Sequence, residues 1–425
     1  MNPIQSVRGM HDILPDDTPL WRWLESELAQ IFDAYDFHEI RTPLVEKAEL
    51  FTRAIGQATD VVEKEMYAFD DRNGETLSLR PEGTAGVVRA VIQHGLLNPP
   101  GLKVWYRGPM FRHERPQRGR QRQFHQFGAE MFGLAEPQAD AELIALGERI
   151  WRRLGLDAVI RLEINSLGDG EDRARYRQQL LDYLEPYASD LDADSQRRLH
   201  SNPLRIFDSK IPETRAIMAN APKLEDALGP DAREHFAQVC RMLDELGIDY
   251  SVNPGLVRGL DYYSRTVFEW VTDQLGAQGT VCAGGRYDGL VEIQGGRATP
   301  GIGFALGAER LTELVRAAGV ERTQNADVFL VYQVDPVRAL QLAEELRDHL
   351  PGMRIGCALS GGSFKAQFKR ADRSGAAYAV VLGESEMAAG ECQVKDLRGS
   401  GPQETLALAD LPKRLGDLLR QAGAA

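Results

Sequence analysis

The residues with the clearest chemical potential lie in one basic stretch, residues 106–128. Its single acid is Glu114, and it contains six arginines: Arg107, Arg112, Arg115, Arg118, Arg120 and Arg122. Guanidinium groups placed this closely repel one another unless an anion shares their site, and the planar fork of arginine binds phosphate through two hydrogen bonds. We therefore expect a polyphosphate ligand here. A solvated basic loop without a specific ligand is the alternative that charge alone leaves open.

The sequence around the arginines predicts a β-hairpin. Residues 103–107 and 124–131 have the composition of short strands, and Pro116 and Gly119 interrupt the segment between them. The two strands would hold a basic tip over the ligand.

Length and composition restrict the class of protein. The chain has 425 residues, of which 43% are hydrophobic and 27% charged, so we expect two or three soluble domains. No apolar run approaches the ~18 residues of a membrane span, and the first residues lack the apolar segment of a signal peptide. We therefore expect a cytoplasmic protein without a membrane partner. The four cysteines are far apart and have no metal-ligand spacing, which predicts reduced thiols and no structural zinc.

The formal net charge of -13 does not favour non-specific binding of nucleic acid. The acidic excess lies mainly before residue 326, and the nearly neutral remainder contains a basic run at residues 365–373. An acidic protein with a few basic patches could select one RNA without binding all RNA. Such a run is also typical of a solvated helix face.

Two further segments contain arginines that could contact the same anion. Residues 301–310 are rich in glycine and end in Glu309-Arg310, although tight packing of a strand on a helix would also explain the glycines. Residues 256–270 include Arg258 in an apolar turn flanked by glycine, where a buried arginine needs an anionic partner. A buried aromatic strand is the simpler explanation for the tyrosines of this segment.

Two shorter segments are weaker by themselves. Residues 283–290, AGGRYDGL, contain a glycine turn, and residues 80–84, RPEGT, precede a predicted helix. In the second segment Thr84 could serve simply as a helix cap. Glu82 beside it could also bind an α-ammonium group at the same helix N-terminus.

These segments together resemble the class II aminoacyl-tRNA synthetases. Phe111-Arg112-His113-Glu114, followed by a loop and Arg120-x-x-x-Phe124, looks like motif 2 of that class. Residues 301–310 resemble motif 3, and a predicted helix at 19–35 with a strand ending at Pro43 resembles the less specific motif 1. Residues 256–270 and 283–290 are similar to the two segments that are specific to the histidyl-tRNA synthetase family, in the expected order and spacing.

The resemblance implies an α+β fold with two domains. Residues 1–325 would form the class II catalytic domain, an antiparallel sheet flanked by helices, with a helical insertion at about 171–250. Residues 326–425 would form an α/β anticodon-binding domain. The alternation of strand and helix patterns beyond residue 326 predicts that second domain independently.

The function implied is that of a histidine–tRNA ligase. The enzyme would activate L-histidine with ATP and Mg²⁺ to histidyl-adenylate, and would transfer histidine to the 3′ end of tRNA(His). Motif 1 implies a homodimer.

The resemblance also assigns roles to individual residues. Arg112 and Arg258 would be catalytic and reach the α-phosphate, while Mg²⁺ would lie near Glu114. The ATP-binding residues would be Arg112, Glu114, Arg115, Arg120, Phe124, Gly307 and Arg310. The histidine-binding residues would be Glu82, Thr84, Gln126, Glu130, Tyr262, Tyr263 and Tyr287. Within this set, Glu130 and Tyr263 would contact the imidazole nitrogens.

Two alternatives remain open at this point. The first is a non-catalytic, histidine-sensing regulatory paralogue of ATP phosphoribosyltransferase, which lacks the C-terminal domain and typically loses catalytic positions. The second is a class II synthetase for another amino acid.

Overall fold

The computed structural model describes residues 3–56, 59–117, 119–201, 203–256, 260, 262–276, 279–399 and 401–423. The chain divides into two compact units, Met1–Glu321 and Arg322–Ala425. None of the helices in the described part of the chain is both long and apolar enough to cross a membrane.

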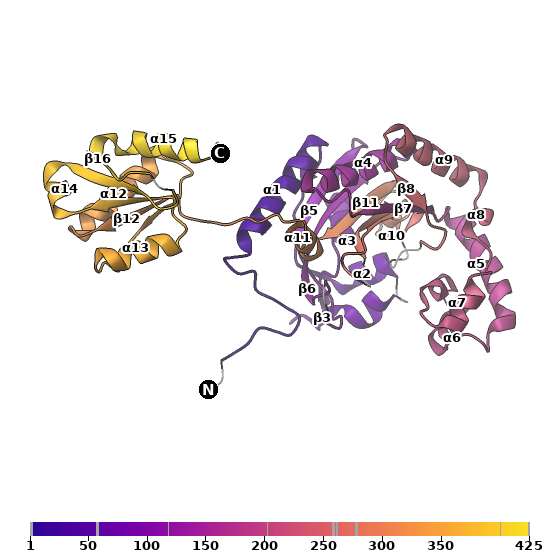
Figure 1. The fold of residues 1–425 in the computed structure, drawn as a ribbon. Coiled ribbons are helices and arrows are strands. Elements are labelled where there is room, and N and C mark those ends of the chain that lie inside the picture. The colour runs from indigo at the N-terminus through magenta and orange to yellow at the C-terminus, as the bar shows by residue number, and fades with distance from the viewer. Residues whose placement is uncertain are drawn as a thin grey trace. The chain divides into compact units, whose positions relative to one another are not determined.

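An eight-stranded sheet forms the centre of the first unit, in the order β1-β5-β6-β11-β10-β9-β7-β8 (Figure 1). The strands are β1 (His38–Glu39), β5 (Leu102–Phe111), β6 (Gln123–Phe132), β7 (Arg161–Ser166), β8 (Tyr250–Val252), β9 (Ser264–Val271), β10 (Thr280–Arg286) and β11 (Gly301–Gly307). All pairs from β5 to β7 are antiparallel, whereas the outer pairs β1–β5 and β7–β8 are parallel. The strand predicted to end at Pro43 is shorter than expected, because only His38 and Glu39 pair with β5.

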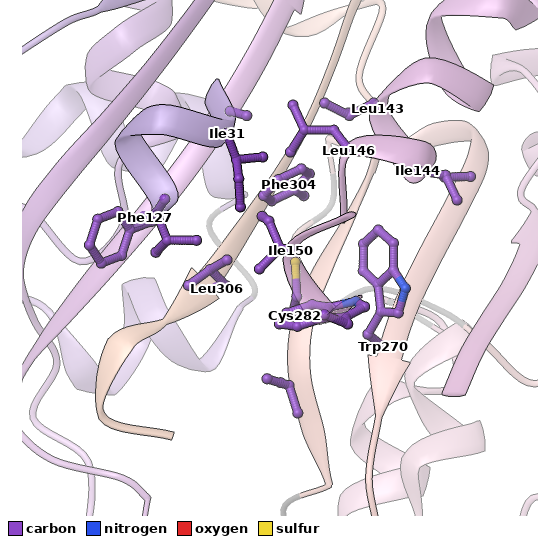
Figure 2. Close-up of a cluster of buried hydrophobic side chains, with 14 of the residues drawn as sticks. Ile31, Phe127, Leu143, Ile144, Leu146, Ile150, Trp270, Cys282, Phe304 and Leu306 are labelled. Atoms are coloured by element: carbon purple, nitrogen blue, oxygen red, sulfur yellow. The ribbon is translucent and has the colours of Figure 1, made fainter. Parts of the chain in front are cut away.

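One face of this sheet packs on three helices, α1 (Thr18–Ala34), α4 (Pro137–Leu154) and α11 (Ala308–Ala317). The helical spacing of apolar residues in α1 buries Leu20, Leu24, Leu28, Ile31 and Phe32, as the sequence predicts. Figure 2 shows the middle of this core, where Ile150 of α4 and Phe304 of β11 lie beside Trp270 of β9. The core fixes the strands that carry the site on their other face.

The opposite face of the sheet packs on α2 (Ala48–Ile55), α3 (Thr84–Gln93) and α10 (Leu290–Ile293). A small sheet in the order β2-β4-β3 adjoins them. Its strands are β2 (Val45–Lys47), β3 (Tyr67–Asp70) and β4 (Thr76–Leu79), and the one-turn helix η1 (Val61–Glu65) precedes β3. Successive side chains of a strand point to opposite faces of the sheet. Neighbouring residues of β5 therefore belong to different cores: Val104 packs in the core beside α3, and Trp105 packs in the core beside α1.

Between β7 and β8 the described residues form helices that are joined by turns. The helices are α5 (Gly170–Leu184), η2 (Glu185–Tyr187), α6 (Ala193–Arg198), η3 (Pro203–Asp208), α7 (Pro212–Met218), α8 (Leu224–Ala227) and α9 (Pro230–Glu245). Asp192 organises the middle of this insertion, since its Oδ2 accepts hydrogen bonds from the hydroxyls of Ser195, Ser209 and Thr214. Helix α9 returns to pack on α4.

The second unit has an α/β fold. Its five-stranded sheet has the order β13-β12-β14-β15-β16. The strands are β12 (Val328–Tyr332), β13 (Ile355–Cys357), β14 (Tyr378–Leu382), β15 (Glu391–Asp396) and β16 (Glu404–Ala407). The helices are α12 (Pro336–His349), α13 (Phe364–Arg373), α14 (Glu384–Ala389), η4 (Leu408–Asp410) and α15 (Leu411–Gly423). The predicted basic run forms α13, where Lys365, Lys369 and Arg373 are exposed.

Close packing of α4 on β9 generates a stability prediction. A β-carbon added to Gly147 of α4 would lie 2.2 Å from Cη2 of the buried Trp270. We expect Gly147→Ala to lower the free energy of unfolding by ~1–2 kcal/mol, because overpacking outweighs the gain in helix propensity. Thermal unfolding would measure this.

The control is Gly170→Ala at the start of α5, where nothing lies within 4 Å of an added β-carbon. This variant should unfold at or slightly above the wild-type temperature. A stable Gly147→Ala protein would contradict the packing described for α4.

Candidate active site

A cavity of about 350 Å³ lies on the face of the main sheet that carries α3. It collects most of the residues predicted for the site. Those that line it are Glu82, Thr84, Arg112, Glu114, Arg120, Phe124, Gln126, Tyr262, Tyr263, Gly307 and Arg310. Strand alternation places Phe124, Gln126 and Glu130 on the same face of β6, so one strand supplies two lining residues and the buried Glu130 beyond them.

One end of the cavity is basic. The Arg112 guanidinium lies 5.4 Å from the centre of the Phe124 ring, and its Nε donates to the Pro81 carbonyl at 2.8 Å. Arg120 forms an ion pair of 3.1 Å with Glu114, whose other oxygen is 3.9 Å from Arg112. Glu114 therefore separates two guanidinium groups that would otherwise repel each other.

Arg310 adds a third guanidinium group from the start of α11. Its Nε donates to the Gly119 carbonyl at 3.1 Å, and a second nitrogen donates to the Thr280 carbonyl. Burial lowers the pKa of Arg310, and the nearby charge of Arg120 lowers it further. This crowding of positive charge favours an anionic ligand.

The other end contains Glu130, which has no exposed surface. Its Oε1 accepts a hydrogen bond from the Thr84 hydroxyl at 2.7 Å, and its Oε2 accepts one from the Tyr287 hydroxyl. Burial raises the pKa of Glu130 to about 8, although these hydrogen bonds oppose the increase. Glu130 and Tyr287 are not among the lining residues. Glu130 lies behind Thr84 and accepts its hydroxyl, and Tyr287 in turn donates to Glu130.

Glu82 occupies the N-terminus of α3. Its two carboxylate oxygens accept the backbone N–H groups of Thr84 and Ala85 at 2.7 and 2.8 Å, while burial raises its pKa. The simple interpretation of Thr84 as the helix cap is therefore wrong, because Glu82 makes the capping contacts. The Thr84 hydroxyl is directed to Glu130 instead.

Gln126 offers an acceptor to a ligand. Its Oε1 is buried and accepts no hydrogen bond from any group in the part of the chain that is described. A buried amide oxygen in this state is expected to find a donor when the cavity is filled.

Only some of the arginines in residues 106–128 lie at the cavity. Arg107 pairs with Glu25 and Glu39 rather than with the cavity, and the exposed Arg115 is not among the lining residues. Two other predicted arginines, Arg118 and Arg258, lie outside the described residues. The expectation of one ligand for all six arginines is therefore too broad.

Three supporting residues were not recognised from the sequence as parts of the site. Glu309 accepts the backbone N–H of His125 and lies 2.9 Å from its Nδ1, which holds β6 beside Phe124 and Gln126. Gly303 makes room for Glu130, since an added β-carbon would lie 1.6 Å from Oε2. The Tyr106 ring similarly fills the space above Gly128. Glycines at alternate positions of residues 301–307 were the available signal for such a close approach.

The fold and the site together define a class II aminoacyl-tRNA synthetase, with an antiparallel sheet that supports a basic hairpin and a glycine-rich strand ending in Glu309-Arg310. Residues 9–311 match a family described as histidyl-tRNA synthetase, and residues 327–418 match an anticodon binding domain. The chain belongs to the histidyl-tRNA synthetase family.

Similar proteins agree with this assignment. The histidine–tRNA ligase of Alkalilimnicola ehrlichii is 58% identical over 98% of this chain and 96% of its own length. That of Halorhodospira halophila is 56% identical over 98% of both chains. The crystal structure of apo histidyl-tRNA synthetase from S. aureus has a TM-score of 0.83 and 37% identity, covering 97% of this chain and all of that one.

These findings confirm the predicted family, the α+β fold class with an anticodon-binding domain, and the activity of a histidine–tRNA ligase. A structure from Bacillus halodurans described as an ATP phosphoribosyltransferase regulatory subunit/histidyl-tRNA synthetase is 21% identical with a TM-score of 0.65. That likeness shows a shared fold alone. The regulatory alternative also predicts the loss of a C-terminal domain, which this chain possesses.

The burial of Glu130 generates a prediction about pH. Its pKa is about 8 in the folded protein, against ~4.3 for an unfolded chain, so the folded state holds the extra proton between these values. The free energy of unfolding should therefore fall as pH rises from about 5 to 8. Glu130→Gln removes this contribution and should gain stability relative to wild type over that range, by up to ~1.4 kcal/mol per pH unit.

Chemical denaturation at several pH values would measure the difference. The exposed Glu213→Gln in α7 is the control and should follow wild type throughout. Parallel curves for Glu130→Gln and wild type would contradict a buried protonated carboxyl group.

Proposed function

We propose that the cavity binds L-histidine at the Glu130 end and ATP at the basic end. The reaction at their junction forms histidyl-adenylate, and the histidyl group is then transferred to the 3′ end of tRNA(His). The observation that carries this proposal is one cavity with a buried carboxyl group behind one wall and three guanidinium groups along another. A zwitterionic amino acid with a hydrogen-bonding side chain and a polyphosphate satisfy both ends.

The first step is a displacement at phosphorus. A carboxylate oxygen of histidine attacks the α-phosphate, a new C–O–P linkage forms, and the bond to the leaving pyrophosphate breaks. The nucleophile is already ionised, so the protein has to align the reactants and stabilise charge rather than remove a proton. Arg112 is the residue proposed to contact both the α-phosphate and the histidine carboxylate, and Arg258 is proposed to reach the same phosphate.

The remaining ATP contacts follow the shape of the basic end. The adenine is proposed to lie between the Phe124 ring and the strand at Gly307, where nothing lies within 4 Å of an added β-carbon. Arg120, Arg115 and Arg310 are proposed to neutralise the β- and γ-phosphates. The carboxylate of Glu114 already lies between two guanidinium groups.

Mg²⁺ is proposed to assist by neutralising phosphate charge. The described residues contain no group of three or more His, Cys, Asp or Glu side chains suited to a metal ion. Mg²⁺ is commonly held by one or two carboxylates together with substrate phosphates, and Glu114 fits that role.

The histidine end is proposed to work through hydrogen bonds. Glu130 is proposed to accept one imidazole N–H in its ionised form, in which each carboxylate oxygen has a lone pair beyond the one that accepts a hydroxyl, and Tyr263 is proposed to contact the second ring nitrogen. Tyr262 is proposed to border the ring, and its own ring centre lies 4.6 Å from that of Tyr263. Tyr287 is proposed to support the site from behind, through its hydrogen bond to Glu130.

The α-ammonium and carboxylate groups of histidine are assigned to three other residues, Glu82, Thr84 and Gln126. The unpartnered Oε1 of Gln126 supports a donor at this place. An amino acid with an apolar side chain would leave Glu130 without a partner, which is an effective way to reject it.

Four wider assignments complete the proposal. The acceptor is the 3′-hydroxyl of the terminal adenosine, and the C-terminal unit contacts the anticodon, with the exposed lysines of α13 as a candidate face. A homodimer is supported by the partly exposed Leu44, Val45 and Phe69 on and beside the small sheet. All four cysteines are free, which supports a cytoplasmic location.

Two variants should separate the two ends of the cavity. We expect Arg310→Met to raise the KM for ATP by about 10- to 100-fold, with little change for histidine, because hydrogen bonds to charged groups are lost. We expect Glu130→Gln to raise the KM for histidine by a similar factor, with little change for ATP. Pyrophosphate exchange into ATP would measure both constants.

The matched control for the first variant is Arg316→Met. It lies on the same helix α11 but pairs with Asp17 outside the main cavity. Equal changes of both constants in either test variant would remove that residue from its proposed end.

Arg258 generates a separate prediction. Arg258→Ala should lower the rate of pyrophosphate exchange by ~10³-fold, because a charge aimed at the reacting phosphate is removed in a water-poor site. The thermal unfolding temperature should stay close to that of wild type. Near-normal exchange would refute the catalytic assignment of Arg258.

A further inference from the structure

The helical insertion contacts the segment that carries Tyr263 through its first helix. Arg173 of α5 donates from Nη1 to the main-chain carbonyl of Tyr263 at 2.7 Å. The next segment of the chain is tied to the start of the insertion through the backbone, because Arg265 N–H donates to the Gly168 carbonyl and Leu167 N–H donates to the Arg265 carbonyl, both at 2.7 Å. Residues 263–265 thus have one hydrogen bond to α5 and two to the chain that leads from β7 into α5.

The backbone of Arg265 has an unfavourable conformation, which the neighbouring hydrogen bonds must stabilise. Its φ is +48°, in the left-handed region that residues with side chains rarely occupy. Such a conformation persists where surrounding contacts determine it, and it is common next to functional sites. Here the surrounding contacts include the main-chain bonds to residues 167 and 168.

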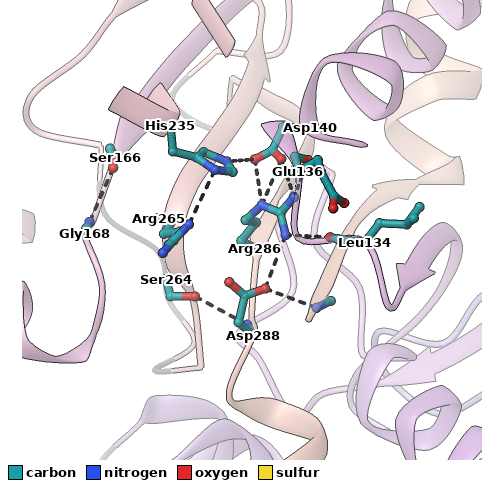
Figure 3. Close-up of polar contacts among 11 residues, drawn as sticks. Leu134, Glu136, Asp140, Ser166, Gly168, His235, Ser264, Arg265, Arg286 and Asp288 are labelled. Atoms are coloured by element: carbon teal, nitrogen blue, oxygen red, sulfur yellow. Dashed lines mark hydrogen bonds and ion pairs between the residues drawn. The ribbon is translucent and has the colours of Figure 1, made fainter. Parts of the chain in front are cut away.

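A buried ionic network lies on the other side of Arg265 (Figure 3). At its centre is Arg286, the last residue of β10, which has no exposed surface. Its Nε and Nη2 donate to the Asp140 carboxylate at 2.6–3.0 Å, and burial of Asp140 is offset by these contacts. Two nitrogens also donate to the carbonyls of Leu134 and Glu136 at 3.0 and 2.9 Å.

Arg286 thereby connects Tyr287 and Glu130, two of the residues proposed for the histidine end of the cavity. Tyr287, whose hydroxyl donates to Glu130, follows Arg286 directly. Leu134 and Glu136 belong to the connection that leaves β6 just after Glu130. The guanidinium group therefore fixes the strand that provides the carboxyl group against the residue that provides its hydroxyl partner.

The last helix of the insertion completes this network. His235 of α9 is nearly buried; its Nε2 lies 3.3 Å from Asp140 Oδ1, and its Nδ1 lies 3.5 Å from Arg265 Nη1. Since arginine can only donate, Nδ1 must accept, and the proton on Nε2 is then directed to Asp140. His235 consequently joins α9, α4 and β9.

We propose that the helical insertion sets the geometry of the imidazole-reading end of the cavity, and that Arg173 and His235 are its two positioning residues. Arg173 acts on the main chain of Tyr263, and His235 acts through Asp140 and Arg286 on Tyr287 and Glu130. Neither side chain is among those that line the cavity. This inference rests on the proposed assignment of Glu130 and Tyr263 to histidine.

The test compares two arginines of helix α5. Arg173→Met should raise the KM for histidine in pyrophosphate exchange by about tenfold and change the KM for ATP by less than about twofold, because one charge-assisted hydrogen bond at the histidine end is lost. Arg177→Met is the matched control. Arg177 donates to the carbonyls of His200 and Ser201 within the insertion, and its loss should leave both constants unchanged.

His235 provides a second, independent test on another helix. His235→Phe should raise the KM for histidine in the same selective way, and His235→Gln should restore most of it, since the amide N–H can still donate to Asp140. A merely structural role would lower the unfolding temperature without a selective effect on histidine.

Three outcomes are decisive. A selective rise with Arg173→Met or with His235→Phe supports the inference at that position, and an unchanged KM for histidine in both folded variants overturns it. Equal rises for histidine and ATP also overturn it. Tyr263→Phe and Glu130→Gln are measured in parallel: if these also leave the KM for histidine unchanged, the proposed histidine site itself is wrong.

Discussion

The site depends on the burial of one carboxyl group, that of Glu130. Removing a carboxylate from water is costly unless hydrogen bonds or opposite charge compensate it. The structure provides two hydroxyl donors, from Thr84 and Tyr287, and burial still raises the pKa to about 8. A ligand N–H donated to Glu130 would favour the ionised carboxylate and oppose this increase.

Much of the surrounding structure serves that burial. Gly303 leaves room for the carboxyl group, because any side chain there would overlap it. The Arg286–Asp140 pair fixes the elements that carry Glu130 and Tyr287. A buried ion pair of this kind contributes little net stability but penalises strongly any arrangement in which one partner is displaced. The network therefore favours one geometry of the cavity end that contains Glu130.

The basic end obeys the opposite electrostatic rule. Arg112, Arg120 and Arg310 approach one another with Glu114 as the acid that pairs with Arg120 and lies near Arg112. Repulsion in the free protein becomes attraction once a polyphosphate binds, so the same positions that reduce stability increase the affinity for an anion. One cavity thus combines a dry, hydrogen-bonding end with a charged end.

Local patterns in the sequence predicted many elements of the fold correctly. The apolar spacing of α1 and the alternation of β6 follow from helix and strand periodicity, and the motifs around Arg112 and Arg310 placed both residues in one cavity. The length of the strand before Pro43 was predicted less well, because its pairing depends on β5, far along the chain. The interpretation of Thr84 as a helix cap was wrong for a similar reason, since its hydroxyl partner lies 46 residues away.

The sequence by itself determined the family, the two kinds of fold and the residue types that could bind an amino acid and a nucleotide, because these depend on periodicity and on motifs of a few adjacent residues. Only the tertiary structure decided which arginines face the cavity and that Glu82 rather than Thr84 caps α3. It also decided that Arg173 and His235 of the insertion contact Tyr263 and Asp140. These outcomes depend on hydrogen bonds and burial between residues far apart in the chain, and no local pattern records such contacts.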